Sequence, residues 1–106
     1  MIYARRNEAV KVKSESSPEI AQPGLDAYPN PFLTGTTVAY RIDRADYVRI
    51  VLYDVAGRVV RTLVESQKAP GMHAVRLDGA SLSAGLYFLD LDAGSGHVTR
   101  AIVLNR

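Results

Sequence analysis

The sequence contains no cysteine and no tryptophan among its 106 residues. Without cysteine, the fold cannot depend on disulfide bonds, and thiol chemistry is excluded. Without tryptophan, an aromatic platform for carbohydrate binding has little support. No apolar run approaches the roughly 20 residues that a membrane-spanning helix needs. The first residues also lack the apolar core of a signal peptide, so any such export signal is expected elsewhere, in a longer parent protein.

An excess of charge of one sign is also missing. The chain has 13 Lys and Arg residues against 11 Asp and Glu residues, which gives a net charge of +2. The two signs are spread along the whole sequence. Because nucleic-acid binding needs a clustered basic surface, this balance predicts no nucleic-acid partner.

No recognisable catalytic or cofactor-binding motif is present either. The serines fall in linker or turn positions, and none stands in the Gly-x-Ser-x-Gly elbow of serine hydrolases. His73 and His97 show no metal-ligand spacing with each other or with a run of carboxylates. We therefore predict that the protein is not an enzyme, and that it has no catalytic residues, no metal centre and no cofactor.

Two pairs of aspartates remain as candidate metal ligands. Asp43 and Asp46 flank a predicted loop, and Asp90 and Asp92 share one face of a predicted strand. A calcium site needs about six to eight converging oxygens. Isolated aspartates in β-loops more often stabilise turns through the backbone. Turn chemistry is the favoured interpretation, and calcium binding by a loop stays open as an alternative.

The first quarter of the chain has the composition of a linker. Residues 13–24 are rich in Ser, Glu, Pro and Gly, and their only large apolar side chain is Ile20. Such a segment cannot bury enough surface to offset the entropy lost on ordering. We predict that residues 1–25 are a linker or the tail of a preceding domain, open to proteases, and that residues 26–106 form one domain.

The sequence Tyr28-Pro29-Asn30-Pro31-Phe32 opens that domain. Each proline lacks an N–H group, fixes φ and biases the residue before it toward an extended conformation. The segment therefore predicts a stiff, extended lead into the domain.

Beyond this segment, apolar residues alternate with a period of two, which is typical of strands buried on one face. We expect Ile50, Leu52, Tyr87, Leu89 and Ile102 in the core, and a polar loop over residues 66–71. The predicted strands cover residues 37–42, 47–53, 59–64, 73–77, 86–91 and 98–104. The simplest fold that buries both sets of alternating residues is all-β, an immunoglobulin-like antiparallel β-sandwich of about seven strands.

Glycines mark the places where the chain is predicted to reverse. Gly57, Gly71, Gly85 and either Gly94 or Gly96 are expected at positive φ, where other residues would be strained. Tyr87 follows the Gly85 turn at the start of a core strand. From this position a tyrosine hydroxyl can bond back to the loop backbone.

The order of these segments resembles the type A C-terminal sorting domain of the bacterial type IX secretion system. The resemblance covers residues 27–106 and consists of YPNPF, TTVAYRI, VRIVLYDVAGRVVRTL, a PGMH turn, LSAGLYFLDL and TRAIVLNR. It implies an immunoglobulin-like domain that directs a secreted or surface protein of the Bacteroidetes across the outer membrane. A sortase-like peptidase usually removes such a domain.

The resemblance also implies partners and a site. The partners would be the type IX translocon, the sortase-like peptidase and an N-terminal cargo domain, with no insertion into the membrane. The protein would be secreted or held at the cell surface after passing through the periplasm. The predicted sorting motif comprises Pro29, Asn30, Pro31, Gly57, Gly71, Gly85, Tyr87, Arg100 and Arg106. We expect the last strand and its two exposed arginines to be recognised.

The same architecture resembles the immunoglobulin-like domain of the flagellar hook-cap protein. Such modules commonly carry a Trp-Asp-Gly turn, and here Leu77-Asp78-Gly79 stands in its place. A structural or interaction module, or an accessory domain of a secreted hydrolase, is therefore the alternative function.

Overall fold

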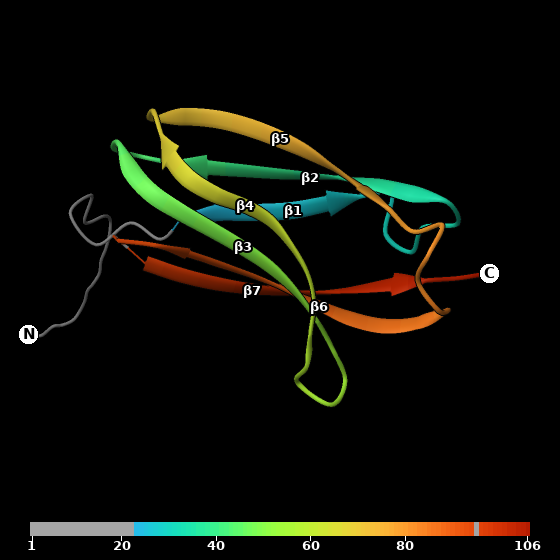
Figure 1. Cartoon of the computed structure of the whole chain (residues 1–106). Helices are drawn as coiled ribbons and strands as arrows, with labels where there is room; N and C mark the ends of the chain where they lie inside the picture. The colour runs from blue at the N-terminus through green and yellow to red at the C-terminus, as the bar shows by residue number, and fades with distance from the viewer. Residues whose placement is uncertain (1–22, 95) are drawn as a thin grey trace, which may run out of the picture.

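A computed structural model describes residues 23–94 and 96–106. This part of the chain forms seven strands, which Figure 1 shows in order. They are β1 (Gly24–Tyr28), β2 (Gly35–Ile42), β3 (Asp46–Asp54), β4 (Val59–Lys68), β5 (Gly71–Asp78), β6 (Gly85–Ala93) and β7 (Gly96–Leu104). The described residues include no helix that could cross a membrane.

The strands form two antiparallel sheets. One has the order β1-β2-β5 and the other the order β4-β3-β6-β7. The sheets face each other, with β1 beside β7 along one side and β4 beside β5 along the other. This arrangement confirms the predicted all-β sandwich.

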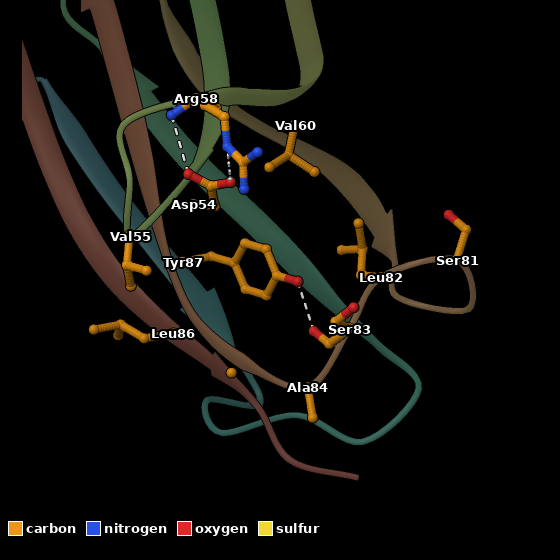
Figure 2. Close-up of a pocket in the computed structure, with 11 residues that line it drawn as sticks. Asp54, Val55, Arg58, Val60, Ser81, Leu82, Ser83, Ala84, Leu86 and Tyr87 are labelled. Atoms are coloured by element: carbon orange, nitrogen blue, oxygen red, sulfur yellow. Dashed lines mark hydrogen bonds and ion pairs between the residues drawn. The ribbon is translucent and has the colours of Figure 1, made fainter.

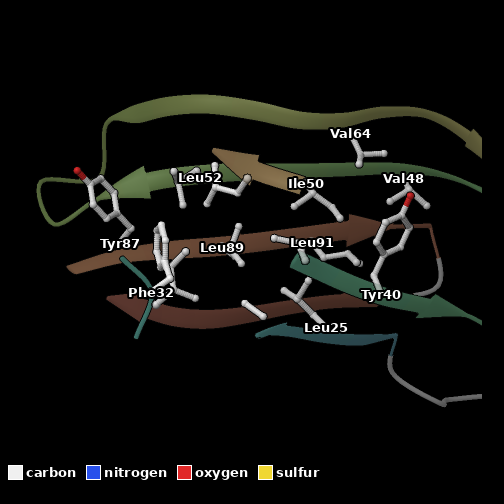
Figure 3. Packing of buried hydrophobic residues seen from close by; sticks show 14 of the residues in the cluster. Leu25, Phe32, Tyr40, Val48, Ile50, Leu52, Val64, Tyr87, Leu89 and Leu91 are labelled. Atoms are coloured by element: carbon white, nitrogen blue, oxygen red, sulfur yellow. The ribbon is translucent and has the colours of Figure 1, made fainter. Parts of the chain in front are cut away.

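The core lies between the sheets and follows the predicted alternation. Figure 3 shows side chains from both sheets meeting in one apolar layer. All of the predicted core residues are buried, namely Ile50, Leu52, Tyr87, Leu89 and Ile102. The alternation succeeds because successive side chains of a strand point to opposite faces, so a local pattern reports which face is covered.

The strand β4 is longer than predicted. Residues 66–68 were expected in a polar loop, but they pair with residues 46–48 of β3, and only Ala69 and Pro70 separate β4 from β5. Their polar side chains suit an edge strand with one solvent-facing side. Backbone pairing with the long strand β3, rather than apolar character, therefore decides where β4 ends.

The proline segment does not lead into the domain as predicted. The strand β1 precedes it, and the peptide bonds Tyr28–Pro29 and Asn30–Pro31 are both cis. The chain bends over residues 29–31 and reaches β7 at Phe32, which forms an isolated parallel bridge with Leu104. The segment is thus a crossover from the edge of one sheet to the edge of the other.

The sandwich begins earlier than the predicted boundary. Gly24 opens β1, and Leu25 is buried in the core, although both were assigned to the linker. Their pairing with Arg41 and Tyr40 of β2 adds them to the sheet. Of the rest of the expected linker, Pro23 is buried, and residues 1–22 lie outside the described residues.

Three of the predicted turn glycines have positive φ, namely Gly57 at 81°, Gly71 at 120° and Gly85 at 146°. Gly94 does not adopt this conformation. A Cβ atom there would lie 2.5 Å from Oδ1 of Asp46, so this glycine leaves room for the aspartate side chain. Its alternative, Gly96, directly follows Ser95, which lies outside the described residues.

Candidate functional site

The strand β7 is the edge strand of the four-stranded sheet. Its inner edge pairs with β6 from Gly96 to Leu104. The outer edge of such a strand presents unpaired N–H and C=O groups, which native proteins usually cover. Here residues 30–32 cover residues 101–105, and we call this contact the C-terminal seam.

Asn30 forms the first half of the seam with its side chain. Its Nδ2 donates a hydrogen bond to the carbonyl of Ala101 at 3.1 Å, and its Oδ1 accepts one from the N–H of Val103 at 3.0 Å. One donor and one acceptor at this spacing replace the peptide group of a neighbouring strand. An aspartate could not donate the first bond, because an ionised carboxylate only accepts.

Phe32 forms the second half with its backbone. Its N–H donates to the carbonyl of Val103 at 2.9 Å, and its carbonyl accepts from the N–H of Asn105 at 2.8 Å. Its side chain is buried in the core (Figure 3). The seam is therefore tied by hydrogen bonds on the outside and filled by an aromatic ring on the inside.

The prolines on either side of Asn30 are exposed. The carbonyl of Pro29 accepts a hydrogen bond from Oγ1 of Thr36 at 2.8 Å, and Thr36 is completely buried. The buried hydroxyl of Thr36 therefore anchors the start of the crossover to β2. The sequence analysis missed this residue, because its partner lies in a turn whose path the sequence does not reveal.

Arg100 lies on β7 but bonds to β1. Its Nε donates a hydrogen bond to the carbonyl of Leu25 at 2.9 Å. This bond connects the edge strands of the two sheets. The residue is exposed, as predicted, and its guanidinium satisfies a backbone carbonyl at a sheet edge.

Arg106 is also exposed, as predicted, and it too bonds to backbone carbonyls. Its guanidinium donates hydrogen bonds to the carbonyl of Leu82, at 2.6 Å, and to that of Gly79. Both carbonyls belong to residues 79–84, which we call the β5–β6 loop. The end of the chain and this loop therefore form one connected structure.

Other residues hold the same loop from its far side. Arg61 of β4 donates to the carbonyl of Asp78 at 2.7 Å and to Oγ of Ser81 at 2.8 Å. The hydroxyl of Tyr87 donates to the carbonyl of Ser83 at 2.5 Å, which confirms the predicted bond back to the loop. The role of Arg61 was missed, because its partners lie beyond the β4–β5 turn.

Gly79 is required where the loop meets the seam. Its N–H donates to the carbonyl of Thr34 at 2.8 Å. A Cβ atom there would lie 3.0 Å from the Phe32 ring and 3.2 Å from the Thr34 carbonyl oxygen. The Leu-Asp-Gly signal in the sequence marked this turn but did not reveal its close contact with Phe32.

A pocket of about 410 Å³ opens beside the β5–β6 loop, with the β3–β4 turn as its other wall (Figure 2). In that turn, Oδ1 of Asp54 accepts from the N–H groups of Ala56 and Arg58, and Oδ2 accepts from Nε of Arg58. The backbone hydrogen bond from Arg58 contributes most to lowering the pKa of Asp54. This carboxylate is therefore committed to turn stabilisation.

Three of the aspartates considered as metal ligands have side-chain or backbone partners. Asp90 accepts from Thr99 at 3.1 Å and pairs with His97, Asp43 pairs with Arg41 at 3.6 Å, and Asp46 accepts from the N–H of Tyr47. Residues 23–94 and 96–106 contain no cluster of three or more potential metal-ligating side chains. Asp46 bonds to the backbone, as the favoured turn chemistry predicts, whereas Asp43 and Asp90 bond to other side chains.

The structure brings together only part of the predicted sorting motif. Asn30 and its flanking prolines meet the end of β7, and Gly85, Tyr87 and Arg106 adjoin the β5–β6 loop. Gly57 lies in the turn across the pocket, whereas Gly71 opens β5 at the opposite end of the sandwich.

A search of curated proteins found no match to this chain. The model of one protein family, described as the secretion system C-terminal sorting domain, matches residues 26–105. This segment covers most of the chain and includes the whole C-terminal seam. The chain therefore belongs to the family of secretion system C-terminal sorting domains, and it is a type IX sorting signal for the export of a cargo protein.

Proposed function

We propose that the type IX translocon recognises the C-terminal seam as a folded surface, rather than isolated basic side chains. The single observation that supports this most strongly is the pair of hydrogen bonds that join the Asn30 side chain to the backbone of Ala101 and Val103. These partners lie 71 and 73 residues away in the sequence. The seam therefore exists only when the last strand is in place, so recognition of the seam would select folded domains.

We further propose that a sortase-like peptidase removes the domain after export by cutting before Gly24. Gly24 and Leu25 pair with β2, and the carbonyl of Leu25 is bound by Arg100. A cut inside β1 would therefore need the sandwich to open first. The Ser/Glu/Pro/Gly-rich residues 13–23 offer a better substrate, because proteases cut linkers rather than sheets.

In this proposal the cargo lies on the N-terminal side and reaches the medium or the cell surface through the periplasm. The domain itself acts by recognition and uses no catalytic residue, cofactor, nucleic acid or membrane insertion. The polar groups beside the pocket support this, since Asp54 and Tyr87 are both engaged with the backbone.

The test fuses residues 23–106 to a periplasm-targeted reporter in a bacterium with type IX secretion, and measures the reporter outside the cells. We expect the unchanged fusion to be exported and Asn30→Asp to reduce export several-fold. The carboxylate cannot donate to Ala101, and losing an exposed bond of this kind costs about 0.5–1.5 kcal/mol.

Gln67→Glu is the matched control, because it makes the same change from amide to carboxylate on an exposed side chain of β4, outside the seam. Its export should equal that of the unchanged fusion. Each variant is first checked for folding by its urea unfolding midpoint. If Asn30→Asp folds and is exported normally, the seam is not the recognised surface; if the unchanged fusion stays in the periplasm, the sorting role of the isolated domain is wrong.

A further inference from the structure

The β5–β6 loop is held at several points, but its contact with the end of the chain differs from the others. Arg61 bonds at the start of the loop, and Tyr87 bonds at Ser83. Arg106 reaches the middle, where it binds the carbonyls of Gly79 and Leu82 across 27 and 24 residues of sequence. This contact joins the loop to a residue beyond β7.

We propose that Arg106 is a positioning residue of the sorting signal: its guanidinium fixes the β5–β6 loop against the end of β7, and the loop in this position is part of the surface that the secretion machinery recognises. This proposal rests on the proposed function, in which the folded end of the domain is recognised. The new element is that the β5–β6 loop belongs to the recognised surface. Arg106 contributes by holding the loop in place, without itself being bound.

The chemistry of the contact suits a fixed geometry. One guanidinium NH₂ group has two hydrogens in a rigid plane, and each can point to one carbonyl. Hydrogen bonds from a charged donor are shorter and stronger than those between neutral groups. The carbonyl of Gly79 also accepts from the N–H of Leu82, so Arg106 binds both ends of one turn.

The residues held in this way face the solvent. Leu82 is buried and anchors the loop in the core, whereas Ala80, Ser81, Ser83 and Ala84 are exposed. They lie close in sequence to the two residues that Arg106 binds, and all four have small side chains. The shape of their surface therefore depends on where the backbone is held.

A direct role of the Arg106 charge is less consistent with this geometry. A partner that bound the Nη2 group would compete with two backbone carbonyls of the loop. The carbonyl of Leu82 would then lose the bond that Arg106 provides. The two roles make different predictions for a lysine variant, which keeps the charge but loses the planar pair of donors.

The experiment compares the full 106-residue chain with its Arg106→Ala and Arg106→Lys variants, by amide hydrogen exchange and by export of the reporter fused to each. In Arg106→Ala we expect the Leu82 amide to exchange about tenfold faster and export to fall several-fold. Arg106→Lys should be intermediate in both measurements. Arg44→Ala, at an exposed arginine in the β2–β3 turn, should change neither.

Three results would overturn the proposal. If Leu82 exchanges faster but export is unchanged, the position of the loop does not matter for sorting. If export falls while exchange is unchanged, or if Arg106→Lys exports fully with a loosened loop, the charge is recognised directly. Should Arg106→Ala fail to fold, Arg106→Gln, which keeps one planar NH₂ donor, replaces it. A wild-type fusion that is not exported would instead contradict the proposed function itself.

Discussion

At the scale of single residues, side chains that bond to distant or neighbouring backbone groups shape the ends of this sandwich. Asn30 pairs with β7, Arg100 with β1, Arg106 with the β5–β6 loop, and Asp54 with its own turn. Each satisfies backbone groups that a strand end or turn would otherwise leave to water. Polar and charged side chains of the surface therefore connect the ends of the strands to neighbouring segments.

The lowered pKa of Asp54 makes a residue-scale prediction about pH. Hydrogen bonds from Arg58 and Ala56 favour the ionised carboxylate in the folded state. A carboxyl group whose folded pKa is depressed stabilises the fold above its unfolded pKa of about 3.9, and this stabilisation is lost as the pH falls through the folded pKa. We therefore expect Asp54→Asn to lower stability at pH 7 and to have a smaller effect at pH 2.

Urea unfolding of both proteins at the two pH values measures this difference. Asp43→Asn serves as the control, because Asp43 is exposed and its ion pair with Arg41 spans 3.6 Å at the surface. A deficit in Asp54→Asn that stays the same at both pH values would show that the charge of Asp54 does not contribute.

At the scale of elements, β6 is a central strand of the four-stranded sheet. It pairs with β3 on one side and β7 on the other, and its inward side chains reach the centre of the core. Leu89 is fully buried, whereas Leu86 on the opposite face is 41% exposed. Leu89 thus lies on the core-facing side of β6, and Leu86 lies on the side that faces the solvent.

This contrast predicts the effect of removing each side chain. Leu89→Ala should lower the free energy of unfolding by about 2–5 kcal/mol, because it loses buried apolar contacts and leaves a cavity. Leu86→Ala, the matched control, should cost roughly 1 kcal/mol or less, because much of its side chain already contacts water. Chemical denaturation measures both values, and equal losses would mean that the faces of β6 are assigned incorrectly.

At the scale of the whole molecule, the last strand is an integral part of the sandwich. It pairs with β6, its outer edge is covered by residues 30–32, and Arg100 links it to β1. Folding is therefore complete only when the final segment has been added to both its neighbours. A sorting signal built in this way is present only when the entire domain is folded.

Limited proteolysis tests the extent of this unit. Trypsin should cut first at Arg5, Arg6, Lys11 or Lys13, and leave a resistant fragment that contains all of β1. The expected reason is that Leu25 is packed in the core and its carbonyl is bound to Arg100. Mass spectrometry identifies the fragments. A first cut within β3 or β4 would contradict this boundary.

The sequence by itself determined the class of fold, the faces of the strands and three of the glycine turns. These features are local: alternation assigns a side chain to one face of its own strand, and a positive φ is a property of one residue. The predicted core around Leu89 and the turn at Gly57 were correct for this reason. The ordered segments also sufficed to indicate the sorting family.

Only the tertiary structure showed where β4 ends, where the proline segment lies, and which groups Asn30 and Arg106 bind. The end of β4 depends on its partner β3, the proline segment follows a strand rather than leading into the fold, and the bonds of Asn30 and Arg106 span more than 20 residues. A hydrogen bond between distant residues requires both partners to be placed by the core before either can be identified. The sequence therefore marked Asn30 and Arg106 as important, but their partners became known only from the folded sandwich.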